Sequence, residues 1–124
     1  MSDSKRWIIV SGIMGLLGVA LGAFGGHGLK NMVSEHIQEI YKTGVFYHLI
    51  HAVVMLAISL SSFNKIKFTL PFFLSGILFF SFSLYVYSIT GIKFLTFLTP
   101  VGGVLFLVGW GMLILAAVKQ EYKD

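Results

Sequence analysis

The sequence has no cysteine and few charged residues. Without cysteine, the chain can form no disulfide bridge and can use no thiolate as a nucleophile or metal ligand. Charged residues make up 11% of the chain, whereas an average soluble domain has about 25%. Apolar residues account for 56% of the chain. This composition argues against a soluble globular domain.

The few charges leave four long stretches of the chain uncharged. These stretches are Trp7–Leu29, Thr43–Asn64, Phe68–Ile92 and Phe94–Val118. At a rise of about 1.5 Å per residue, roughly 20 helical residues cross the hydrocarbon core of a bilayer. Barrel strands would be shorter and would alternate in polarity. The sequence therefore predicts an all-α, four-helix transmembrane bundle with short loops, a single domain over residues 1–124. The predicted spans are about 7–27, 43–63, 68–90 and 99–118.

The basic residues indicate an orientation in the membrane. They stand singly or in pairs at the ends of the spans, so the net charge of +4 does not indicate a nucleic-acid partner. With four spans, both termini and the middle loop share one side. That side carries Lys5, Arg6, Lys65, Lys67, Lys119 and Lys123, and the other side carries Lys30, Lys42 and Lys93. Six basic residues on the first side against three on the other predict that both termini are cytoplasmic. The protein is therefore expected to be a multi-pass protein of the cell (plasma or inner) membrane.

The first span also has some features of a secretory signal peptide. Lys5 and Arg6 precede an apolar run, and the small residues of "ALGA" follow it. The run is longer than the usual 7–15 residues of a signal peptide. We therefore expect the first span to be retained.

No acidic side chain lies inside a span. The five acidic residues are Asp3, Glu35, Glu39, Glu121 and Asp124. Transporters coupled to protons or cations commonly use an acid within the membrane, and a nucleophile–base–acid triad would lack its acid here. We therefore expect neither an enzyme nor a cofactor.

Glycines form a strip along the first span. At about 100° per residue, the six glycines between positions 12 and 26 share an arc of roughly 140°. Pairs of small residues four positions apart allow helices in lipid to approach closely. We predict a helix-packing seam, within the chain or between copies, and a ligand groove is the alternative. The predicted packing residues are Gly15, Gly18, Gly22, Gly26 and, in the fourth span, Gly103.

The second span continues a polar lead-in. Ser34 is a plausible N-cap, and an interfacial lead-in at about 34–42 runs into the span, which predicts one helix from about 35 to 62. Most of its polar atoms fall on one stripe, which should face the bundle interior. The stripe consists of Tyr41, Gly44, His48, His51, Met55, Ser59 and Ser62.

Two prolines indicate where helices begin. Pro71 suits the first turn of the third span, and Thr99 followed by Pro100 suits the N-cap and first position of the fourth.

With no acid, lysine or arginine inside a span, the histidines are the main candidates for chemistry inside the membrane. We predict a candidate polar pocket near the non-cytoplasmic face, formed by His27, Tyr47, His48, His51 and Tyr85. A protonatable group at this depth is a functional hypothesis by default. Five roles are open: neutral histidines hydrogen-bonded across a helix seam, a zinc or copper site, haem ligation by His27 and His51, a small-molecule or quinone site, or a contact with a partner.

Three segments of the chain resemble a known family. They are "GAFGGHGLK", "YKTGVFYHLIHAVVML" and "FFSFSLYVYSITGIKFLTFLTPVGGVLFLVGW". In this order they resemble the small membrane proteins called domain of unknown function 423, or uncharacterised protein family 0382. The resemblance runs from about residue 8 to 118 and implies a four-span membrane protein with no assigned activity. The family's motifs match Gly26–Leu29, Tyr47, His51, Ser83–Tyr85, Thr99–Gly103 and Trp110. His48 stands where members commonly have glutamine, and Phe82 where they commonly have glycine.

The sequence therefore favours a structural or accessory membrane protein. We expect it to sit in the lipid bilayer and to act by helix packing, with itself as a homo-oligomer or with a partner complex. The alternative is a binder or carrier of a small molecule, a quinone or a metal through the His/Tyr polar pocket.

Overall fold

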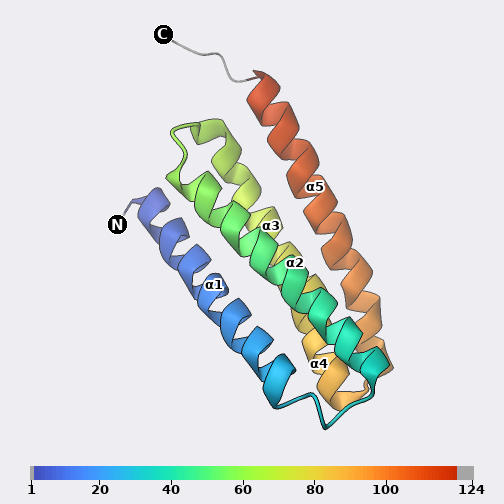
Figure 1. The fold of residues 1–124 in the computed structure, drawn as a ribbon. Helices are drawn as coiled ribbons and strands as arrows, with labels where there is room; N and C mark the ends of the chain where they lie inside the picture. The colour runs from blue at the N-terminus through green and yellow to red at the C-terminus, as the bar shows by residue number, and fades with distance from the viewer. Residues whose placement is uncertain (1, 120–124) are drawn as a thin grey trace.

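The computed structural model describes residues 2–119, and every regular element in this range is helical. Four helical segments are long and apolar enough to cross a membrane: Asp3–His27, Glu35–Leu60, Asn64–Thr90 and Lys93–Lys119. They run antiparallel, so that the start of the first and the end of the last lie at the same end of the bundle (Figure 1). The predicted fold class, an all-α four-helix transmembrane protein, is confirmed. Lys123, Glu121 and Asp124, which the charge arguments used, lie outside the described residues.

The first two helices begin at serine caps. α1 (Asp3–His27) begins after Ser2, whose side chain accepts a hydrogen bond from the Lys5 amide. α2 (Glu35–Leu60) begins after Ser34, whose Oγ accepts from the Ile37 amide at 3.3 Å. The predicted interfacial lead-in and the predicted second span thus form one continuous helix. Its buried residues are Tyr41, Gly44, His48, His51, Ala52, Met55, Ile58 and Ser59. This set contains every residue of the predicted stripe except Ser62, which is exposed beyond the end of the helix, and it adds Ala52 and Ile58.

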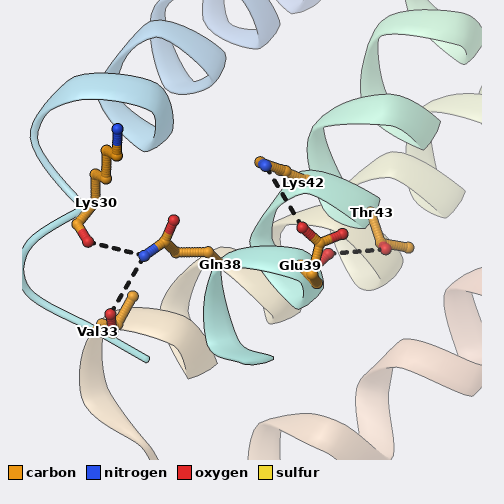
Figure 2. A network of polar contacts seen from close by, with 6 residues as sticks. All are labelled: Lys30, Val33, Gln38, Glu39, Lys42 and Thr43. Carbon is orange, nitrogen blue, oxygen red and sulfur yellow. Dashed lines mark hydrogen bonds and ion pairs between the residues drawn. The ribbon is translucent and has the colours of Figure 1, made fainter. Parts of the chain in front are cut away.

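The loop between α1 and α2 is held against the end of the bundle. Leu29 is buried and packs in a cluster with Tyr41. The side-chain amide of Gln38, on the first turn of α2, donates to the carbonyl oxygens of Lys30 at 2.8 Å and Val33 at 3.4 Å (Figure 2). One amide group thus satisfies two carbonyls of the loop, which fixes the path of the chain from α1 into α2.

The third span is not a regular α-helix. It consists of the 3₁₀ helix η1 (Asn64–Thr69), α3 (Leu70–Gly76), the π-helical turn η2 (Ile77–Ser81) and α4 (Phe82–Thr90). Pro71 lies in the first turn of α3, as predicted. In the π turn the Phe82 amide bonds to the carbonyl of Ile77, five residues earlier. Such a turn takes up extra chain without breaking the helix, and the sequence pattern did not predict it.

The fourth span begins earlier than predicted. The 3₁₀ helix η3 (Lys93–Phe97) leads directly into α5 (Leu98–Lys119). The prediction that Thr99 is the N-cap was therefore wrong. The hydroxyl of Thr99 instead forms a hydrogen bond with Ser83 Oγ at 2.6 Å, which joins the start of α5 to α4.

The four spans differ in how much of their surface the chain covers. α1 packs mainly on α2, and α5 packs on α3 and the π turn (Figure 1). In the most apolar part of each span, 17% of residues are buried in α1 and 22% in α5, against 39% in α2 and 44% in the third span. The second and third spans are therefore central, and the first and fourth turn most of their surface outward.

Candidate functional site

His48 lies at the centre of a network that joins three spans. Its ring is fully buried. Nε2 lies 2.7 Å from the carbonyl oxygen of Met14 on α1, and Nδ1 lies 2.8 Å from the hydroxyl of Tyr85 on α4. A carbonyl can only accept, so Nε2 carries the proton. A neutral ring has one N–H, so Nδ1 accepts from the Tyr85 hydroxyl.

His51 lies one turn further along α2 and faces different partners. Nδ1 lies 2.7 Å from the carbonyl oxygen of Tyr47, so it donates. Nε2 accepts from the indole N–H of Trp110 on α5 at 3.1 Å. Because an indole can only donate and a carbonyl can only accept, these two bonds fix a neutral ring protonated at Nδ1. This tautomer is the opposite of the one in His48.

The two histidines have no nitrogen lone pair free for a ligand. Both ring nitrogens of His48 and of His51 are engaged with different neighbours. A metal ion would have to displace the Tyr85 hydroxyl or the Trp110 indole. Between residues 2 and 119, no group of three histidines, cysteines or acids comes together that could hold an ion. The two rings therefore link helices through hydrogen bonds.

His27 does not converge with the other residues of the predicted pocket. It is the last residue of α1 and is exposed. Gly25 of α1 lies against the ring of Tyr41, so His27 is level with the first turns of α2. His51 lies ten residues beyond Tyr41, about 15 Å deeper along the helix. The pocket predicted from His27, Tyr47, His48, His51 and Tyr85 is thus divided. His48 pairs with Tyr85, and His51 with Tyr47, while His27 stands apart.

Tyr47 and His51 instead border a groove that opens outward between α2 and α5. Its volume is about 540 Å³. Its walls include the rings of Tyr47, His51, Phe80, Phe106 and Trp110 and the backbone of Gly103, and we refer to it as the aromatic groove. His51 stacks on Phe106 with ring centroids 3.7 Å apart and ring planes 11° apart. Tyr47 and Trp110 are 38% and 39% exposed, so the groove is open to the surroundings of the bundle.

The interface between α1 and α2 contains the same arrangement twice, seven residues apart: a side chain of α2 donates a hydrogen bond to a backbone carbonyl of α1 next to a glycine. The Tyr41 hydroxyl donates to the carbonyl of Leu21 at 2.6 Å, and His48 donates to the carbonyl of Met14. In each case the side chain approaches a glycine four residues beyond that carbonyl, namely Gly25 and Gly18. The missing side chain lets the donor of α2 reach the backbone of α1.

Glycine also shapes the α3–α5 seam. A Cβ on Gly109 would stand 2.9 Å from Phe73, and a Cβ on Gly76 or Gly102 would clash with Phe106 or Phe80. Phenylalanine rings therefore fill the spaces beside Gly76 and Gly109, whereas Gly102 lets the backbone of Phe80 in the π turn approach α5 closely.

The five glycines predicted to pack have different positions. Gly18 faces Leu49, and Gly22 faces Val45, both on α2. A Cβ on Gly15 or Gly26 would have no neighbour within 4 Å, and one on Gly103 would only graze Phe80 at 3.9 Å. Gly15 and Gly26 therefore take no part in a seam within the described chain.

The chain shows clear similarity to proteins of one family. A profile described as "Protein of unknown function (DUF423)" matches residues 21–103. The UPF0382 membrane protein YwdK of Bacillus subtilis (strain 168) is 42% identical over 120 residues, 93% of this chain and 98% of the relative. The chain belongs to this family.

Other members of the family are also named membrane proteins. The UPF0382 membrane protein SAB0533 of Staphylococcus aureus (strain bovine RF122 / ET3-1) is 37% identical over 93% of this chain and 97% of its own length. The UPF0382 membrane protein of Haemophilus influenzae is 34% identical over 94% and 97%. No solved structure matches. The chain is a multi-pass membrane protein of this family, and its relatives' names give no activity.

The predicted site did not include Trp110, whose indole N–H donates to His51. The signal was a tryptophan in the interior of an uncharged span. An indole N–H at such a depth needs an acceptor, and the carbonyls of its own helix are already occupied. Gly103, Phe106 and Trp110 share one face of α5, and all three line the aromatic groove.

Proposed function

We propose that this protein is a non-enzymatic accessory component of the plasma or inner membrane that associates with a second copy of itself through α1. The observation that carries the proposal is a strip of glycines on α1 that the rest of the described chain does not cover. A Cβ on Gly12, Gly15 or Gly26 would meet no atom within 4 Å. Glycine inside a helix is unfavourable by about 0.5–1 kcal/mol relative to alanine, so uncovered glycines call for a packing reason.

The surroundings of the strip support close contact with another helix. Val19 lies along the same face and is 65% exposed. Beside the strip, a groove of about 320 Å³ runs between α1 and α2, with Gly22 and Gly26 on one wall and Val45 and Phe46 on the other. A partner helix could therefore approach the α1 backbone and fill this groove, and van der Waals packing of that kind drives association in lipid.

The absence of cysteine allows a clean test in native membranes. A Val19→Cys variant has one thiol on the strip, and an Ile114→Cys variant has one on the exposed face of α5. Under mild oxidation, we expect a disulfide-linked dimer from Val19→Cys and little from Ile114→Cys. Adding Gly15→Leu should abolish the dimer, whereas adding Gly111→Leu, the matched change at an open glycine of α5, should not. Equal cross-linking at both positions, or none at Val19, would refute self-association through α1. A cross-link to a different protein would show a partner complex instead.

A binding function has a different basis from the one the sequence suggested. The nitrogens of His48 and His51 are committed to internal bonds, and His27 lies elsewhere. What favours a binder is the aromatic groove, which is lined by Tyr47 and neighbouring rings and of which Tyr47 and Trp110 are exposed.

A further inference from the structure

The hydroxyl of Tyr47, a residue that is 38% exposed, has no hydrogen-bond partner in the part of the chain that the structure describes, whereas the buried polar side chains of α2 do. Tyr41 and His48 donate to α1, His51 is bonded to Trp110, and Ser59 donates to the carbonyl of Met55. In the span predicted for residues 43–63, the Cα of Tyr47 lies about one helical turn, roughly 6 Å, inside the non-cytoplasmic end. A hydroxyl in hydrocarbon without a partner is costly, and lipid tails offer no acceptor. The groove therefore suits an occupant that carries an acceptor oxygen.

The walls of the aromatic groove suit a flat occupant. The ring planes of Tyr47 and His51 are 8° apart, and those of Tyr47 and Phe106 are 18° apart. His51 and Phe106 are themselves stacked. Aromatic rings prefer offset stacking on planar groups, which a flexible tail cannot provide.

The aromatic groove also has a volume typical of a small-molecule site and free space beside Gly103. Its volume of about 540 Å³ falls within the roughly 300–1,000 Å³ that small-molecule sites occupy. Gly103 forms part of the lining, and its nearest neighbour on that side is Phe80. A larger side chain at position 103 would project into the space.

We propose that the aromatic groove binds the ring of a membrane-dissolved quinone, with the Tyr47 hydroxyl donating a hydrogen bond to a ring carbonyl. This site goes beyond the packing function and does not depend on it, because α1 forms none of its walls. The proposal concerns binding alone. The ring would enter from the lipid through the exposed side of Tyr47 and Trp110, and its tail would remain in the bilayer.

Trp110 provides an internal reporter for the test. The chain has two tryptophans, so Trp7→Phe leaves only the one that lines the groove. In the full-length protein in lipid nanodiscs, titration with ubiquinone-1 should quench Trp110 fluorescence to saturation. Tyr47→Phe, which removes only the hydroxyl, should weaken the apparent affinity about 3- to 10-fold. Tyr87→Phe, which removes a hydroxyl outside the groove, should leave the affinity unchanged.

A second pair of variants tests the space itself. Gly103→Leu should abolish saturable quenching, whereas Gly111→Leu, on an open face of the same helix, should not. Thermal unfolding of each variant verifies that it is folded. Quenching that rises linearly with quinone, or that Tyr47→Phe leaves unchanged, would overturn the proposal. Phospholipids brominated on their tails complete the test, because quenching by these lipids that ubiquinone-1 cannot relieve would show a groove filled by lipid.

Discussion

At the scale of single residues, the interior of this protein is arranged to satisfy polar groups. Many span serines and threonines donate to a carbonyl one turn earlier in their own helix, as Ser11, Ser59 and Ser88 do. His48 instead bonds across helices through both ring nitrogens, and His51 does so through Nε2. An interhelical hydrogen bond in a membrane contributes about 0.6 kcal/mol on average, up to about 1.7. His48 makes two such bonds, so its main effect is to fix how α1, α2 and α4 lie relative to one another.

The hydrogen-bond pattern predicts opposite tautomers for two histidines three residues apart. In protein labelled with ¹⁵N at histidine and embedded in lipid, we expect His48 to be protonated at Nε2 and His51 at Nδ1, both rings being neutral. The reason is that Met14 O and Tyr47 O can only accept, while the Trp110 indole can only donate. Solid-state NMR shifts of the ring nitrogens distinguish the two forms.

Trp110→Phe is the control for this assignment. Without the indole donor, Nε2 of His51 loses its partner while Nδ1 keeps its bond to the Tyr47 carbonyl, so His51 should stay protonated at Nδ1, the ¹⁵N shift of its Nε2 should move, and both shifts of His48 should stay as before. Identical tautomers in the unmodified protein would contradict the described network.

At the scale of helices, the sequence determines which elements exist better than how they fit. Four uncharged runs of sufficient length leave helices as the only choice, because no water is present to bond a free backbone. The π turn at Ile77–Ser81 has no such signal, since its residues differ little from those around it. It depends on contacts between helices, including the bond from Ser81 Oγ to the carbonyl of Gly44 at 2.7 Å.

The candidate site could be predicted in part for the same reason. The stripe on α2 correctly indicated that His48 and His51 face inward, because helical periodicity alone fixes that face. Periodicity does not show which neighbouring helix each ring meets, so the split between Tyr85 and Trp110 could not be foreseen. Nor does it give relative depth, which is why the predicted pocket joined His27 to His51, a ring about 15 Å deeper along α2.

Glycine-to-alanine changes on α1 should have opposite effects depending on the face. Gly25→Ala places a methyl group against the ring of Tyr41 and should displace its hydroxyl from Leu21 O, destabilising the fold by about 1–3 kcal/mol. Gly15→Ala meets open space and should be neutral or slightly stabilising, since alanine is the better helix former. Thermal unfolding in a detergent that keeps the protein monomeric measures both. If the two variants shift the midpoint equally, the assignment of faces is incorrect.

At the scale of the whole molecule, the polar and charged groups are unevenly distributed between the two ends. The end that holds the start of α1 and the end of α5 also holds the turn after α2 (Figure 1). Lys67 there donates to Ser4 Oγ at 2.6 Å, and Lys65 to the carbonyl of Lys119 at 3.5 Å. Each lysine therefore ties the turn to a terminal helix. The same cluster of positive charge that closes this end of the bundle also favours keeping it in the cytoplasm.

This charge distribution predicts a topology with both termini in the cytoplasm. In a bacterial host, green fluorescent protein fused after the C-terminus should fluoresce, and alkaline phosphatase at the same point should be inactive. Phosphatase inserted after Lys30, in the loop at the opposite end of the bundle, should be active. Replacing Lys5, Arg6, Lys65 and Lys67 by glutamine and adding lysines to the 28–34 loop should reverse the reporters in part of the population, because orientation follows the Lys/Arg bias of short loops. An active C-terminal phosphatase in the unmodified chain would invert the orientation and would place the α1–α2 loop, with His27, in the cytoplasm.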